Sequence, residues 1–205
     1  MIDLPAQLAA RMNQPLPGPA AMRAWSPQLA YGRHFVPPPE NARRAAVAVL
    51  LYPHAGEWYV PLTLRPAHLS EHAGQVSLPG GSLEAGESPD VGAWRELEEE
   101  LGVPRVAFAP LGQLTPLYVF ISNFHVVPCL AIGHARPEFR PSPAEVAQVI
   151  EFPLSALRDP QTRGEMWIER RAVRFRAPCW DFGGQRIWGA SALILGELAA
   201  LLAGG

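Results

Sequence analysis

The sequence predicts a mixed α/β fold. Several apolar or alternating runs have the length of β-strands, and two other segments have helical spacing and recognisable helix ends. A chain of 205 residues, of which 48% are hydrophobic, can also bury a substantial core in one domain with small additions at its ends. We therefore expect one domain over residues 41–205, preceded by a short extension.

The extension covers residues 1–40. It begins with a weakly amphipathic segment, Leu4 to Met12, and continues through the proline-rich stretches PLPGP and VPPPE. Clustered prolines favour extended backbone and interrupt helices. We expect an N-terminal extension that ends in an extended linker.

Two strands and a turn begin the domain. The run RRAAVAVLLY is typical of a buried strand, and the turn PHAGE leads into a second strand, WYVPLTLR. Because only a short turn separates the two runs, we expect a β-hairpin. The segment RPAHLSEHAGQVSLPGG then joins this hairpin to a helix.

The clearest helix prediction covers Pro89 to Leu101. Ser88 is a good N-cap, Pro89 suits the first helical position, and Gly102 is typical after a helix end. At about 100° per residue, one side of this helix is apolar and the adjacent side is acidic. The apolar side comprises Val91, Trp94, Leu97 and Leu101, and the acidic side comprises Glu96, Glu99 and Glu100.

The next part of the chain extends the sheet. Strands are expected in RVAFAPLGQLTPL and NFHVVPCLAIG, with Tyr118 to Asn123 as the turn between them. A polar loop follows, and then a short strand near Val149 to Phe152 and a short helix that begins at Pro153.

The end of the chain adds a hairpin and a helix. Alternating polarity over Met166 to Phe175 predicts the hairpin. The last elements are a strand, QRIWG, and an apolar helix, ASALILGELAALLA, which we expect to be core or the surface of a homodimer.

The acidic side of the central helix needs a physical explanation. Like charges three or four residues apart repel by a few tenths of a kcal/mol per pair, and these lie toward the negative end of the helix dipole. A hard divalent cation such as Mg²⁺ reverses this effect, because it binds carboxylate oxygens. Arg95 lies beside the stripe and can orient Glu87 or Glu99. A solvated acidic helix face is the simpler alternative.

The spacing around this helix resembles the Nudix box. Gly81, then Glu87, and then RELEEELGV from Arg95 match the box at every fixed position, a coincidence on the order of 10⁻⁸ per starting position. The resemblance implies an αβα sandwich with a mixed β-sheet and hydrolysis of a nucleoside diphosphate linked to another group. It also implies Mg²⁺ or Mn²⁺, held by Glu96, Glu99, Glu100 and the backbone carbonyl of Gly81.

A second motif, just before the box, resembles the coenzyme A pyrophosphatase branch of the family. The shared residues are Leu62, Thr63, Arg65, His68, Leu69, His72, Ala73, Gly74, Gln75, Pro79, Gly80 and Gly81. The chain departs from the motif at Pro66, Ser70 and Leu78, where Ser, Arg and Phe are usual. The resemblance implies that coenzyme A or acyl-CoA is cleaved to 4′-phosphopantetheine and adenosine 3′,5′-bisphosphate. Because the usual arginine is missing at position 70, Arg65 becomes the candidate substrate-phosphate contact.

The resemblance also implies a proton acceptor beyond the box. In several Nudix families a glutamate on a later loop reaches the metals or takes the proton from water, and Glu145 resembles it by its place before V-x-x-V-x-x-x-P-L. A solvated loop glutamate is the alternative, and Glu151, in a predicted strand, is the fallback. Glu99 and Arg95 complete the expected catalytic set.

Other functions stay open at this point. One is a Nudix hydrolase of ADP-ribose or NADH, and another is a Nudix-fold module that senses a nucleotide without cleaving it. The run HLSEH also has the H-x-x-E-H spacing of a zinc peptidase, but Pro66 before it and Gly74 after it leave too little room for the helix such a site needs.

Composition narrows the partners. A net charge of −2 does not indicate the basic surface that binding of long nucleic acid requires. A small nucleotide is therefore the better candidate substrate. All 17 basic residues are arginine, which excludes a P-loop lysine. Cys129 and Cys179 are expected to be buried free thiols. No segment resembles a signal peptide or membrane span, so we expect a cytoplasmic protein, and the lysine-free composition suggests a bacterial one.

Overall fold

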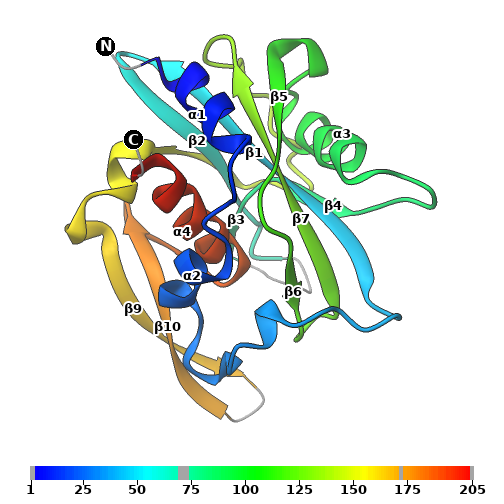
Figure 1. Cartoon of the computed structure of the whole chain (residues 1–205), viewed down its shortest axis with the longest axis vertical. Helices are drawn as coiled ribbons and strands as arrows, with labels where there is room; N and C mark the ends of the chain where they lie inside the picture. The colour runs from blue at the N-terminus through cyan, green and yellow to red at the C-terminus, as the bar shows by residue number, and fades with distance from the viewer. Residues whose placement is uncertain (1–2, 69–73, 171–172, 204–205) are drawn as a thin grey trace.

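Strand β1 (Arg43–His54) runs through the middle of the main sheet in the computed structural model of this chain (Figure 1). The structure describes residues 3–68, 74–170 and 173–203. β1 pairs antiparallel with β2 (Glu57–Leu64), as the hairpin prediction requires, and parallel with β7 (Phe124–Gly133). The main sheet is therefore mixed.

Short strands complete this sheet. β5 and β6 pair antiparallel with β7, β8 and β3 pair with β2, and β4 pairs with β1, so the described residues give eight strands. Their bounds are Val76–Ser77 for β3, Gly80–Ser82 for β4, Phe108–Gln113 for β5, Leu117–Val119 for β6 and Gln148–Pro153 for β8. After β8 the predicted short helix is a 3₁₀ turn, Leu154–Leu157.

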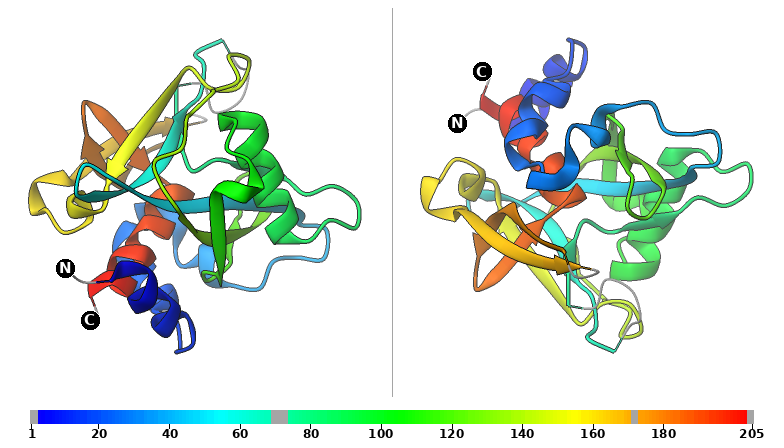
Figure 2. Two further views of the ribbon diagram at one scale, coloured as in Figure 1. Left: turned by 90° about the horizontal axis from the view of Figure 1, so that it is seen from above. Right: turned by 90° about the horizontal axis from the view of Figure 1, so that it is seen from below.

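Helices cover both faces of the main sheet. Helix α3 (Pro89–Leu101) lies on one face and helix α4 (Ala190–Ala203) on the other (Figure 2). Alternate side chains of β1 point to opposite faces of the sheet. Ala48 and Leu50 belong to the core under α3, whereas Val49 belongs to the larger core around α4. A strand buried on both faces explains the continuous apolar run in the sequence. The predicted fold class, an αβα sandwich with a mixed sheet, is confirmed.

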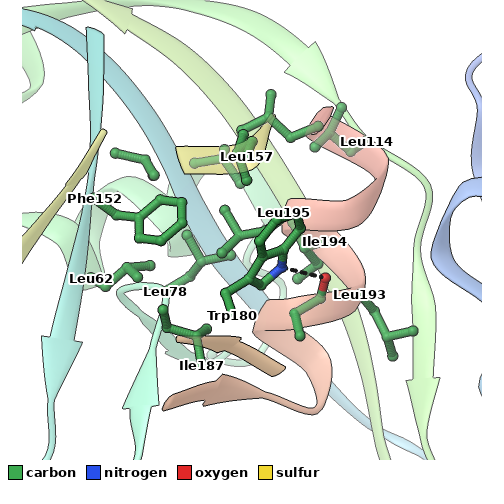
Figure 3. Packing of buried hydrophobic residues seen from close by; sticks show 14 of the residues in the cluster. Leu62, Leu78, Leu114, Phe152, Leu157, Trp180, Ile187, Leu193, Ile194 and Leu195 are labelled. Carbon is green, nitrogen blue, oxygen red and sulfur yellow. Dashed lines mark hydrogen bonds between the residues drawn. The ribbon is translucent and has the colours of Figure 1, made fainter. Parts of the chain in front are cut away.

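A smaller antiparallel sheet packs beside α4. It consists of β9 (Arg163–Arg170), β10 (Val173–Phe182) and β11 (Gln185–Trp188), with β10 in the centre. The predicted hairpin is present and longer than expected. Trp180 of β10 is fully buried in the core around α4, where its indole Nε1 donates a hydrogen bond of 3.5 Å to the carbonyl of Ala192 (Figure 3).

The N-terminal segment is more structured than a linker. It forms α1 (Leu4–Met12) and α2 (Gly18–Met22), followed by 3₁₀ turns at Arg23–Trp25, Gln28–Ala30 and Arg33–Phe35. Trp25 stacks on Trp180 with ring centroids 3.6 Å apart, and it joins the same hydrophobic core. Helix α1 coincides with the amphipathic segment of the sequence, but local sequence does not show that Trp25 finds a partner in β10.

Two residues of α4 hold this segment in place. Gly196 leaves room for the Trp25 ring, since a Cβ there would collide with its Cδ1. Glu197 is fully buried and accepts hydrogen bonds from the backbone N–H groups of Gly18 and Thr115 and from the Thr115 hydroxyl. These contacts join α4 to the start of α2 and to the chain between β5 and β6.

Two further expectations concern the thiols and the helices. Cys129 and Cys179 are buried and free, as predicted. None of the helices within the described residues is long and apolar enough to cross a membrane. The apolar α4 is instead buried inside the chain's own core.

Candidate metal and catalytic site

Helix α3 carries most of the candidate site, and its ends match the prediction. The Ser88 side chain accepts a hydrogen bond from the Val91 N–H at 3.5 Å, and Pro89 occupies the first turn. Gly102 ends the helix with φ of 68°, a conformation that favours glycine, and its N–H bonds the Glu98 carbonyl at 2.8 Å. Because Leu97 and Leu101 are buried against the sheet, the adjacent acidic side faces a fixed direction.

Three carboxylates converge beside α3. Oxygens of Glu96, Glu100 and Glu145 all lie within 4.8 Å of one another, although Glu145 comes from a loop more than forty residues later in the chain. That loop packs against the C-terminal end of α3, where the Ser142 N–H donates to the Glu100 carbonyl at 2.9 Å. The Arg140 N–H donates to Leu101 in the same way at 2.8 Å. We call Glu96, Glu100 and Glu145 the carboxylate cluster.

Burial and mutual repulsion make this cluster electrostatically unfavourable without a cation. Glu100 is only 3% exposed, and burial, followed by the charges of Glu96 and Glu145, raises its pKa to about 8. Arg65 and the Gly80 N–H act in the opposite direction. Burial also raises the pKa of Glu96. Among the described residues, no group donates a hydrogen bond to Glu100 Oε2, so this buried oxygen has a free coordination position.

Arg95 organises the acidic side chains on the flank of the carboxylate cluster. Its guanidinium donates to both oxygens of Glu87 at 3.0 and 3.1 Å, and to Glu96 and Glu99 at 2.9 Å each. The hydrogen bond from Arg95 lowers the pKa of Glu87. In the same way, the hydrogen bond to Glu87 is the largest of the effects that raise the pKa of Arg95. This network fixes the Glu96 side chain from one side, and the predicted catalytic role of Arg95 stays a prediction.

Glu99 lies apart from the carboxylate cluster. Its side chain is 56% exposed, and it pairs with Arg95 rather than joining Glu96 and Glu100. The structure thus brings together two of the three predicted metal-binding glutamates of the helix with Glu145. The predicted ligand and catalytic roles of Glu99 stay predictions.

The paired glycines before the helix, Gly80 and Gly81, lie too close to their neighbours to carry a side chain. A Cβ on Gly81 would collide with the Glu96 carboxylate, and a Cβ on Gly80 would collide with the Ala46 carbonyl oxygen. Gly80 also has φ of 153°, and its N–H helps to lower the pKa of Glu100. The sequence analysis did not foresee this role of Gly80, although its place in the Pro-Gly-Gly run marks a tight backbone approach.

Arg65 lies directly after β2, beside the carboxylate cluster. Its Nε is buried and has no hydrogen-bond partner among the described residues, and its charge lowers the pKa of Glu100. Backbone hydrogen bonds link it to the far end of the following loop, from its N–H to the Gln75 carbonyl at 3.0 Å and from the Gly74 N–H to its own carbonyl at 3.2 Å. Ser70 and the second histidine of the H-x-x-E-H run, His72, lie outside the described residues.

Glu151, the fallback proton acceptor, is already hydrogen-bonded to other side chains. It forms a bidentate ion pair with Arg136 at 2.7 and 2.8 Å and accepts a hydrogen bond of 2.8 Å from the Tyr52 hydroxyl. The hydrogen bond from Arg136 is the largest of the effects that keep the pKa of Glu151 low. These contacts suit a structural clamp at the end of β8.

Sequence comparisons identify the family of the chain. The family model described as NUDIX domain matches residues 42–174. A protein named "Uncharacterized Nudix hydrolase NudL" from Pectobacterium atrosepticum is 34% identical over 163 residues, covering 79% of this chain and 84% of its own length. The protein of the same name from Yersinia pestis is 34% identical over 158 residues, covering 77% and 78%.

Solved structures agree on the fold. The MutT protein from Methanosarcina mazei Go1 superimposes with a TM-score of 0.53 at 17% identity, over 80% of this chain and 96% of its own. A MutT/nudix family protein from Enterococcus faecalis gives a TM-score of 0.53 at 17% identity, over 98% and 75%. With the family model and the relatives, the chain belongs to the Nudix hydrolases, metal-dependent enzymes that act on nucleoside diphosphate derivatives.

Proposed function

We propose that this protein hydrolyses the diphosphate bond of coenzyme A and its derivatives, giving 4′-phosphopantetheine and adenosine 3′,5′-bisphosphate. The observation that carries the proposal is Arg65, whose buried Nε has no described partner beside the carboxylate cluster. A guanidinium in this position suits a substrate phosphate, which it binds as a planar fork. Arg65 also belongs to the motif that resembles the coenzyme A branch, which favours this substrate over other nucleoside diphosphates.

The carboxylate cluster fits Mg²⁺ or Mn²⁺. Three convergent carboxylates, one of them with a buried oxygen that lacks a donor, match the oxygen ligands that these hard cations prefer. Glu96, Glu100 and Glu145 would hold the ion, and Glu99 and the Gly81 carbonyl are further proposed ligands. When bound, the cation stabilises negative charge on phosphoryl oxygens and makes water more acidic.

Glu145 is the proposed proton acceptor. It is the exposed member of the carboxylate cluster and comes from a loop, so water and substrate can reach it. Glu99 is the second candidate for this role, because it lies one helical position from Glu100 and faces solvent. Arg95 would keep Glu96 and Glu99 in fixed orientations through its hydrogen bonds.

The decisive experiment is an assay of product masses. The protein is incubated with Mg²⁺ or Mn²⁺ and, separately, coenzyme A, ADP-ribose and NADH. Phosphopantetheine and the bisphosphate from coenzyme A, with little turnover of the others, are the expected result. Cleavage of ADP-ribose or NADH alone would replace the proposal with the second candidate substrate class, and ligand binding without any cleavage would support a nucleotide sensor.

A variant of Arg65 tests the phosphate contact separately. Arg65→Gln should raise the KM for coenzyme A by about tenfold or more, since a charge-assisted contact is lost. Arg105→Gln is the matched control: Arg105 is exposed and bonds the Phe108 carbonyl on a different part of the chain. Equal KM values in both variants would remove Arg65 from the substrate site.

A further inference from the structure

A cavity of about 430 Å³ lies between the small sheet and the loop that follows β2. Its walls include Met166 and Ile168 of β9, Gln185 and Trp188 of β11, and Gln75 from the loop. The volume falls within the range of small-molecule sites, which are commonly lined by apolar side chains with a few polar groups. No role has been given to this cavity so far.

Backbone contacts connect the cavity to the candidate catalytic site. Gln75, in its wall, accepts the hydrogen bond from the Arg65 N–H, and Arg65 acts electrostatically on Glu100. Strand β3, which follows Gln75, also contacts β11. The backbone of Arg65 is therefore one hydrogen-bonded pair away from the cavity wall.

The alternation of β9 explains why this strand gives the cavity apolar side chains. Met166 and Ile168 are half-buried and pair across the strand with the buried residues Ala177 and Phe175 of β10. The residues between them point the other way and are exposed, as Glu165 shows. Met166, Ile168 and the half-buried Trp188 thus present accessible apolar surface toward one side of the small sheet.

The charges in the wall favour a neutral occupant. Arg186 lines the cavity but pairs with Asp181 at 3.7 Å. The described wall therefore offers no uncompensated cation for a phosphate group. The Gln185 amide can exchange hydrogen bonds with amide groups, and the thioether and indole suit alkyl and sulfur atoms.

We infer that this cavity binds the neutral, amide-containing and sulfur-terminated arm of the substrate, the pantetheine part of coenzyme A. The inference rests on the proposed function for its choice of ligand. It assigns recognition of the leaving arm to β9 and β11, which lie outside the Nudix box. Phosphates remain at Arg65 and the carboxylate cluster, and the arm enters the cavity.

Pantetheine itself provides the test, because it contains no phosphate and cannot be a substrate. Ligand-observed NMR on the full chain should detect binding in roughly the millimolar range. Ile168→Trp fills the cavity and should weaken binding at least about tenfold. Glu165→Trp is the matched control, with the same new side chain on the outward side of the same strand, and it should bind like the wild type.

Enzyme kinetics provides the second readout. Ile168→Trp should raise the KM for coenzyme A about tenfold and leave kcat within about a factor of two. If Ile168→Trp folds poorly, Met166→Trp from the same wall can replace it. This variant should show the same change in KM. Absence of pantetheine binding to the wild type, or equal binding to Ile168→Trp, would overturn the inference. If the wild type does not cleave coenzyme A, the proposed function fails, and the pantetheine titration still decides whether the cavity binds this arm.

Discussion

Two buried glutamates in this protein have opposite environments. Glu197 of α4 is fully buried, and three donors from two separate parts of the chain satisfy its carboxylate. Glu100 of α3 is almost as buried, yet it faces two other carboxylates, and its Oε2 has no described donor. Burial alone therefore does not distinguish a structural carboxylate from one proposed to bind a metal. The distinction lies in whether the fold itself supplies the compensating groups.

The strongest test of the contrast is Glu100→Gln. The amide keeps the shape but loses the charge that would bind the cation, so kcat should fall by on the order of a thousandfold while the fold is retained. Steady-state kinetics and circular dichroism measure the two effects. Glu98→Gln, an exposed change on the same helix, should keep wild-type activity. Unchanged turnover in Glu100→Gln would remove Glu100 from the metal site.

Glu197→Leu should show the reverse pattern: a loss of stability with little change in activity. Three donors, two from Thr115 and one from Gly18, would lose their buried acceptor, which should cost about 3–4 kcal/mol of unfolding free energy. Urea unfolding measures the loss, and kcat of the remaining folded protein should stay near wild type. Thr115→Val, which removes only the hydroxyl donor, should cost less. A stable Glu197→Leu variant with impaired kcat would contradict the structural role.

The pH dependence of stability should also separate the two sites. The pKa of Glu100 is raised to about 8 in the folded protein, from an ordinary value of 4.5, so between these values the folded state binds more protons than the unfolded state. The stability of the metal-free protein should fall as pH rises through this window, by about 1.4 kcal/mol per unit and thus about 2–3 kcal/mol between pH 5 and 7.

Urea unfolding in EDTA at several pH values measures this slope. Glu100→Gln should flatten it, because the amide does not titrate. Mg²⁺ should oppose it, because the cation binds the ionised carboxylate. A slope that persists in Glu100→Gln would assign the dependence to other groups.

The smallest effect is expected at Arg95. Arg95→Lys keeps the charge but cannot bond Glu87 through two nitrogens and reach Glu96 and Glu99 at once. Metal affinity should fall about tenfold, the lower end of the range for residues that orient ligands. Mn²⁺ titration followed by electron paramagnetic resonance measures it. Wild-type affinity would show that the Arg95 network is structural only.

Local signals predicted the elements well. Helix α3 begins and ends where Ser88 and Gly102 place it, because capping depends on residues next to each other in sequence. The convergence of Glu145 with Glu100 depends instead on backbone hydrogen bonds such as Ser142 to Glu100, which no local pattern encodes. Only the family resemblance pointed to Glu145.

The same limit explains what the sequence analysis missed. The prolines near the N-terminus predicted a linker, but the Trp25 stack on Trp180 joins residues more than 150 positions apart. On the acidic side of α3, by contrast, the sequence predicted that Arg95 orients Glu87 or Glu99, and Arg95 pairs with both.

The parallel pairing of β1 with β7 has a consequence for how the chain folds. Arg43 pairs with Phe124, and the register continues to Leu51 and Ile132, so the central ladder joins segments about eighty residues apart. Such non-local pairing makes folding slow, because the intervening loop must close before the contacts form. During synthesis, α3 can emerge and form early, yet the sheet beneath it cannot close until β7 is made. Glu145 emerges later still, so the carboxylate cluster can assemble only after the chain beyond β7 has been made.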